Sequence, residues 1–108
     1  MGFNPGNMNK MMKQVKKMQR EMARVQEELA QAEVEGTAGG GMVRATFDGH
    51  GQIRALSIAR EAVDPDDVEM LQDLVLAAIR DGQAKVQQLA QEKMAAVTGG
   101  MSLPGGWL

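Results

Sequence analysis

The sequence predicts an α+β fold with the element order α-β-β-β-α, formed as a single domain over residues 1–108 and assembled as a dimer. Three observations predict it. Apolar residues recur at alternating spacings of three and four over residues 8–34, as in a helix that pairs through one face. Apolar and polar residues then alternate between glycine-rich turns over residues 34–58, which is typical of strands. A second helical repeat follows over residues 65–98.

The first helix is expected over residues 8–34, after a flexible lead-in over residues 1–7 that is rich in glycine, proline and asparagine. Such a helix is about 40 Å long, whereas a compact domain of this size has a radius of gyration of only about 13 Å. One end should therefore project, and its apolar seam should need a second chain. The residues expected in this dimer interface are Met11, Val15, Met18, Met22, Val25 and Leu29.

A three-stranded antiparallel meander is expected next. Val34–Ala38 is the first strand, and the glycines at 39–41 permit a tight turn. Apolar residues alternate with other side chains from Val43 to Phe47, which predicts the second strand. Asp48-Gly49-His50-Gly51 is a strong hairpin signal, and Gln52–Ile58 is expected to form the third strand.

The second helix is expected over residues 65–98. Asp64 would cap it, with Pro65 at the first helical position. Gly82 lies inside the helical repeat, where it costs about 1 kcal/mol relative to alanine, so it marks either a close contact or a kink. Glycines follow Thr98 and are suited to ending the helix, and a flexible tail is expected over residues 99–108.

The charges are unevenly distributed. The chain has a net charge of −2, yet its first 26 residues hold six cations and one acid. On the heptad pattern the cations lie opposite the apolar seam, away from the positions where ion pairs between chains form. This basic stripe consists of Lys10, Lys13, Lys16, Lys17, Arg20 and Arg24. Since mixed charges would serve solubility equally well, the stripe favours a role in anion binding.

Duplex DNA fits this stripe better than the other anions considered. An amphipathic helix lying on a membrane needs its apolar face free, whereas pairing through the seam would occupy that face. Single-stranded nucleic acid usually requires aromatic stacking platforms, and the chain has only Phe3, Phe47 and Trp107. Phosphate contacts to a duplex need only aligned Lys and Arg side chains.

Catalytic and cofactor chemistry is not expected. The chain has no cysteine, and His50 is its single histidine, so neither residue type can assemble a metal site or a catalytic pair; His50 is interpreted as a solvent-exposed turn residue. Neither a phosphate-binding loop nor a complete calcium loop is present. No apolar run is long enough for a signal peptide or a membrane span. We therefore expect a cytoplasmic, non-enzymatic protein without cofactor, metal, membrane partner or small-molecule substrate.

Several segments together resemble the YbaB/EbfC family of bacterial nucleoid-associated DNA-binding proteins. They include EELAQAEVEGTAGGG, GGGMVRATFDGHGQIRALSI, DDVEMLQDLVLAAIRDG and EKMAAVTGGMSLPG, in this order over nearly the whole chain. The resemblance implies an α-β-β-β-α protomer and a tweezer-shaped homodimer whose projecting helices bind DNA. It also implies a role in organising the nucleoid and in gene regulation.

A second hypothesis is a non-enzymatic dimeric scaffold or adaptor. Methionine side chains repack easily against different partners, so the methionine-rich seam and the C-terminal tail would in this case hold a protein partner. Strict heptad spacing favours self-association through the seam instead. The two hypotheses therefore differ in what the first helix binds.

Overall fold

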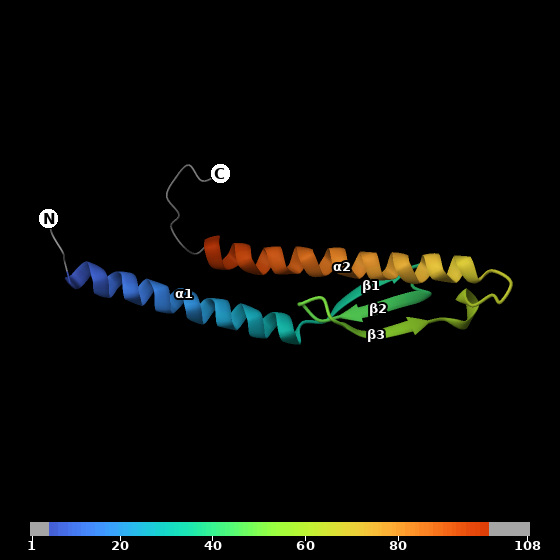
Figure 1. Ribbon diagram of the computed structural model, residues 1–108, viewed down its shortest axis with the longest axis horizontal. Helices are drawn as coiled ribbons and strands as arrows, with labels where there is room; N and C mark the ends of the chain where they lie inside the picture. The colour runs from blue at the N-terminus through green and yellow to red at the C-terminus, as the bar shows by residue number, and fades with distance from the viewer. Residues whose placement is uncertain (1–4, 100–108) are drawn as a thin grey trace, which may run out of the picture.

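The computed structural model describes residues 5–99, and its element order is the predicted one. The elements are α1 (Pro5–Gln31), β1 (Val34–Ala38), β2 (Val43–Phe47), β3 (Ile53–Ile58), the short 3₁₀ helix η1 (Arg60–Ala62) and α2 (Val68–Gly99). The strands form one antiparallel sheet in the order β1-β2-β3, and α2 runs along one face of it (Figure 1). The predicted α+β class is confirmed. Residues 1–4 of the predicted lead-in and residues 100–108 of the predicted tail lie outside the described residues.

The boundaries of α1 differ from those predicted. The helix begins at Pro5 rather than residue 8, so residues 5–7 of the expected lead-in are helical. Proline is well tolerated in the first helical turn, where its missing N–H has no helical acceptor. The helix ends at Gln31 rather than residue 34, because Val34 pairs with Phe47 in the sheet.

Glycines shape both turns of the meander. Gly39, Gly40 and Gly41 all have positive φ angles, between 62° and 91°, a region that other residues rarely adopt. In the second turn, the Asp48 and Gln52 backbones bond to each other, so β3 begins at Ile53, one residue later than predicted. A register shift between Thr46 and Phe47 accompanies this turn.

The core lies between α2 and the first two strands. Val43, Ala45 and Phe47 of β2 are buried together with Ala78 and Val86 of α2. β3 is an edge strand that α2 does not cover, and all six of its residues are exposed. The sheet is therefore buried on one face and only over part of its width.

Gly36 of β1 and Gly82 of α2 mark the closest approach between sheet and helix. A Cβ on Gly36 would lie 2.1 Å from the Ala78 carbonyl oxygen and 2.3 Å from the Gly82 nitrogen. A Cβ on Gly82 would meet the Phe47 ring. Gly82 therefore marks a close contact, one of the two alternatives that the sequence left open.

Replacing Gly36 with alanine is expected to destabilise the fold by about 3 kcal/mol, because the new methyl group meets backbone atoms that cannot move aside. Gly99→Ala is the matched control, because nothing lies within 4 Å of its added Cβ, and it should change stability by less than about 0.5 kcal/mol. Urea unfolding of the three proteins measures both effects. Equal stabilities for Gly36→Ala and the wild type would contradict the described packing.

The start of α2 also corrects the sequence prediction. Asp64 does not cap the helix and Pro65 is not its first residue; the Asp67 amide bonds to the Asp64 carbonyl instead, which closes a turn before the helix. The Asp67 carboxylate then accepts a hydrogen bond from the Met70 amide at 3.1 Å. Asp67 is thus the residue that caps the helix, which begins at Val68.

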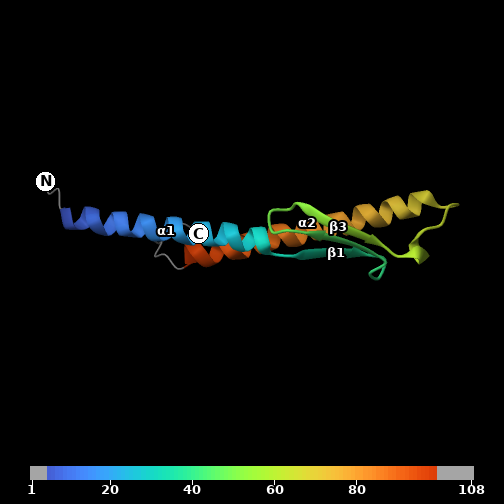
Figure 2. The same ribbon diagram turned by 90° about the horizontal axis from the view of Figure 1, so that it is seen from below.

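The chain is far from compact. Its radius of gyration is 21.4 Å and its longest extent is 78 Å, compared with about 13 Å for the radius of gyration of a compact chain of this length. The N-terminal part of α1 extends beyond the end of α2, as both views show (Figures 1 and 2). One helix therefore projects from the two-layer body.

Candidate functional site

The projecting part of α1 is an arm, which we define as residues 6–20. Every residue of the arm is exposed, and Figure 2 shows it running past the C-terminal end of α2. The remaining turns of α1 pack against α2. A helix exposed on all sides over four turns requires a binding partner to explain the apolar residues on it.

The six residues of the basic stripe follow one face of α1. All six are exposed, and their helical positions lie opposite the apolar seam. Lys17, Arg20 and Arg24 border a shallow hollow of about 310 Å³ together with Glu21. Arg24 also lies 3.7 Å from the Glu28 carboxylate, which partly balances its charge. The positive charge of the stripe is therefore greatest between Lys10 and Arg20.

The apolar seam is divided into two parts. On the arm, Met8, Met11, Met12, Val15 and Met18 are 36–64% exposed. Nearer the sheet, Val25 and Leu29 are only 2% and 5% exposed, because they pack against Val97 of α2 in the same chain. Met22 lies between the two parts and packs at the edge of this cluster.

The division corrects the expectation that the whole seam needs a second chain. Val25 and Leu29 were expected in a dimer interface, but α2 already covers them and leaves almost no surface for another protomer. The heptad repeat identified the apolar face of α1 correctly. Part of that face, however, is covered by α2 of the same chain and not by a second chain. The apolar side chains of the arm portion remain 36–64% exposed.

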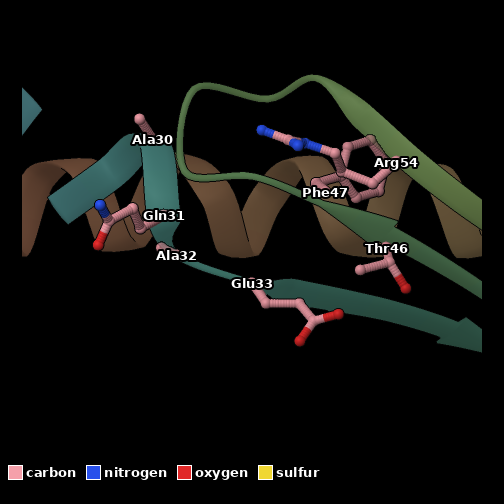
Figure 3. Close-up of a pocket in the computed structure, with 7 residues that line it drawn as sticks. All are labelled: Ala30, Gln31, Ala32, Glu33, Thr46, Phe47 and Arg54. Carbon is pink, nitrogen blue, oxygen red and sulfur yellow. The ribbon is translucent and has the colours of Figure 1, made fainter. Parts of the chain in front are cut away.

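Polar contacts fix the base of α1. Lys93 of α2 lies 2.8 Å from the Glu28 carboxylate, and this hydrogen bond and charge lower the pKa of Glu28. The loop between β2 and β3 contributes a second contact, since the Gly49 amide donates to the Leu29 carbonyl at 2.7 Å. Figure 3 shows the last turn of α1, the link through Ala32 and Glu33, and Arg54 beside this loop. No periodicity in the sequence indicates these contacts.

Four acidic side chains lie far from the arm. Asp66, Asp67, Glu69 and Asp73 belong to the start of α2 and the turn before it, at the end of the molecule opposite the arm (Figure 1). A phosphate chain lying along the arm therefore does not meet these carboxylates. The basic stripe on the arm and these four carboxylates lie at opposite ends of the molecule. A strongly basic arm is therefore compatible with the net negative charge of the protein.

His50 is exposed, with its Nε2 atom 3.2 Å from the Gln26 carbonyl oxygen. We expect His50→Ala to leave dimerisation and DNA affinity within about twofold of the wild type, because the exposed imidazole belongs to neither the basic stripe nor the apolar seam. Sedimentation and DNA titration of the variant check this expectation. A loss of affinity greater than about tenfold would contradict it.

The pKa values of three carboxyl groups predict a loss of stability in acid. Burial raises the pKa of Asp48, but hydrogen bonds from Gln52, Arg54 and His50 outweigh it, and the pKa falls below its ordinary value of 3.8. The pKa of Asp81 is lowered by the Thr37 amide and Lys85, and that of Glu28 by Lys93. Carboxylates with lowered pKa values stabilise the fold above their ordinary pKa values and lose this contribution as pH falls through the lowered ones.

Urea unfolding at fixed protein concentration should therefore show nearly constant stability from pH 7 to pH 5, with a decline below about pH 4. Asp48→Asn should be less stable than the wild type at pH 7, and the difference should narrow as pH falls. A difference between the two proteins that is independent of pH would show that the Asp48 charge does not stabilise the fold.

Comparison with known proteins shows what this arrangement is related to. The sequence model of the YbaB/EbfC DNA-binding family matches residues 4–101. The chain belongs to this family. It is 58% identical to a nucleoid-associated protein of Exiguobacterium sp., over 93% of this chain and 95% of the relative. It is 59% identical to a nucleoid-associated protein of Geobacillus kaustophilus, over 93% of each chain.

The fold of this chain is also found in a solved structure. The crystal structure of an uncharacterized protein of Helicobacter pylori superposes with a TM-score of 0.68 at 24% identity, covering 94% of this chain and 99% of that one. The likeness concerns the fold alone. Within residues 5–99, no helix is both long and apolar enough to cross a membrane, and the same residues contain no cluster of metal-ligating side chains.

Proposed function

We propose that this protein is a homodimeric, non-enzymatic nucleoid-associated protein that binds double-stranded DNA through its phosphates. We place it at the nucleoid in the cytoplasm of a bacterial cell, where it would organise DNA and influence gene expression. The observation that carries the proposal is the arm, which presents the exposed basic stripe on one face and exposed apolar side chains on the other. The family match supports DNA as the partner.

The length and composition of the stripe favour phosphate contacts on a duplex. Fourteen residues separate Lys10 from Arg24, a helical rise of about 21 Å, which corresponds to about six base pairs at 3.4 Å each. Phe47, the one aromatic residue within 5–99, is buried against Gly82. The described residues therefore offer cations for phosphates, and the His50 imidazole is the only exposed ring among them on which an unpaired base could stack.

Two exposed apolar surfaces support the homodimer. The first is the arm portion of the seam, where Met11, Val15 and Met18 remain our proposed interface residues, with Met22 at its edge; Met8, Met11, Met12 and Val15 border an open hollow of about 440 Å³.

The second apolar surface is on β3, where Leu56 and Ile58 pair with the buried Ala45 and Val43 yet are 46% and 38% exposed. Two separate apolar surfaces on so small a chain are typical of a protomer whose second copy is missing.

The adaptor hypothesis rests on the same seam, because exposed methionines also suit a protein partner of variable shape. It predicts a different ligand for the arm and no use of the basic stripe. A test with DNA alone therefore separates the two hypotheses.

Fluorescence anisotropy with labelled duplexes tests the proposal. Two duplexes of unrelated sequence, each about 30 base pairs, should bind with affinities within about fivefold of one another, because phosphate contacts carry no sequence information. Single-stranded DNA of the same length should compete at least about tenfold less well. Sedimentation of the unliganded protein should show a dimer. A protein that sediments as a monomer and binds neither duplex would overturn the proposal and leave the adaptor hypothesis.

A further inference from the structure

Within one chain, the direction of the arm is determined at its base. Only Ala32 and Glu33 connect α1 to the sheet, and residues 7–20 of the arm are all exposed. From Leu29 to Lys10 the helix rises about 28 Å. A tilt of about 10° at Leu29 therefore displaces Lys10 by about 5 Å, which exceeds the 3.4 Å rise of one base pair.

The loop between β2 and β3 holds the last turns of α1. The Gly49 amide donates to the Leu29 carbonyl at 2.7 Å, and His50 Nε2 lies 3.2 Å from the Gln26 carbonyl. Leu29 is one of the last four residues of α1, whose carbonyl groups have no donor four residues further along the helix. Its carbonyl also accepts a hydrogen bond from the Ala32 amide at 3.3 Å. The Gly49 amide thus makes the shorter of the two hydrogen bonds to Leu29.

The loop is itself rigidly built. Asp48 is only 4% exposed; its Oδ1 atom accepts hydrogen bonds from the His50 and Gln52 amides at 2.9 and 3.0 Å. Its Oδ2 atom accepts one from Arg54 at 3.0 Å. With its backbone held by a buried carboxylate, the loop presents the Gly49 amide to α1 in one position.

Gly49 lies in close contact with the end of α1. A Cβ on Gly49 would lie 2.5 Å from the Leu29 carbonyl oxygen and 2.7 Å from the Leu29 Cα. A hollow of about 460 Å³ also borders the helix end, lined by residues of that end, its link and the sheet (Figure 3). A methyl group on Gly49 would therefore press on the Leu29 backbone at the base of the arm, next to this open space.

We propose that Gly49 and the Asp48-centred loop are positioning elements that set the direction of the α1 arm, and through it the alignment of the basic stripe with DNA. Only the part of this inference that concerns the alignment with DNA rests on the proposed function. The effect on the direction of the arm follows from the protein alone.

Gly49→Ala tests this inference, because Gly49 has no positive φ and the substitution adds a clash without backbone strain. Gly99→Ala is the matched control, since it adds the same methyl group where nothing lies within 4 Å and where the glycine has no positive φ. The chain has no cysteine, so cysteines placed at the exposed positions Gln14 and Gln87 can carry the only two spin labels. Diluting labelled protein with excess unlabelled protein confines the measured distance to one protomer.

We expect the label distance to shift or broaden by about 4 Å in Gly49→Ala, because Gln14 lies about 22 Å along the helix from Leu29, and to stay unchanged in Gly99→Ala. DNA affinity should fall about tenfold or more in the first variant and less than about twofold in the second. If Gly49→Ala does not fold, Asp48→Asn, which cannot accept the Arg54 hydrogen bond in the same way, should broaden the distance instead.

An unchanged distance in a folded Gly49→Ala protein would overturn the inference, whatever the DNA affinity. If the distance shifts while the wild type binds no DNA, the inference stands and the proposed function fails. If both change in Gly49→Ala alone, both are supported.

Discussion

Replacing Lys13, Lys17 and Arg20 with glutamine is expected to lower the affinity for duplex DNA by about 100-fold at about 0.15 M salt, if each lost phosphate contact costs about fivefold through counterion release. The three side chains are exposed on the arm, and glutamine retains a good helix propensity. The variant should therefore remain a folded dimer. Its loss of affinity should be the same for every duplex sequence, because phosphates are read without regard to bases.

The matched control removes cations from the body instead. Arg60 and Arg80 are exposed outside the arm, and replacing both with glutamine should lower affinity by less than about threefold, through the change in net charge alone. Titrations of both variants on two unrelated duplexes make the comparison. A triple variant that binds as tightly as the wild type would show that the stripe is only a solvated surface.

Placing aspartate at Met18 and Met22 is expected to dissociate or unfold the protein, because a carboxylate buried in an apolar interface costs several kcal/mol. The structure indicates which substitution would cause dissociation and which would cause unfolding. Met22 packs at the edge of the cluster formed with Val97 inside the chain, whereas Met18 lies on the exposed arm. Substitution at Met22 therefore also affects the protomer itself.

Met11→Asp with Met18→Asp is the sharper pair, because both side chains are exposed in the single protomer. We expect it to raise the dimer dissociation constant more than about 100-fold, with little change in the helical circular dichroism signal. Sedimentation velocity at a protein concentration of about 10 µM distinguishes dimer from monomer. A wild type that sediments as a monomer under these conditions would contradict the homodimer.

Local patterns in the sequence were sufficient to predict the elements and the two faces of α1. The heptad repeat placed the apolar seam, and the charges placed the stripe on the opposite face. Periodicity reports which side of a helix is apolar and not what covers it. For this reason the packing of Val25 and Leu29 against Val97, about 70 residues away in the chain, could not be predicted.

The other differences between the sequence prediction and the structure arise from competing local signals or from contacts between residues far apart in the chain. Asp64 and Asp67 are both plausible caps, and the turn that Asp64 closes moved the start of α2 to Val68. His50 was correctly interpreted as an exposed turn residue. The loop that contains His50 holds the end of α1 through the contact between Gly49 and Leu29. No sequence pattern relates these two residues, so the contact could not be predicted.

The salt dependence of duplex binding by the wild-type protein tests the central claim most directly. If the two stripes of a dimer bring four to six cations to phosphates together, the logarithm of the association constant should fall with the logarithm of salt concentration with a slope of about −4 to −5, between about 50 and 200 mM. Anisotropy titrations at four salt concentrations measure this slope. Binding with a slope shallower than about −1, or no binding at the lowest salt concentration, would contradict phosphate recognition by the basic stripe.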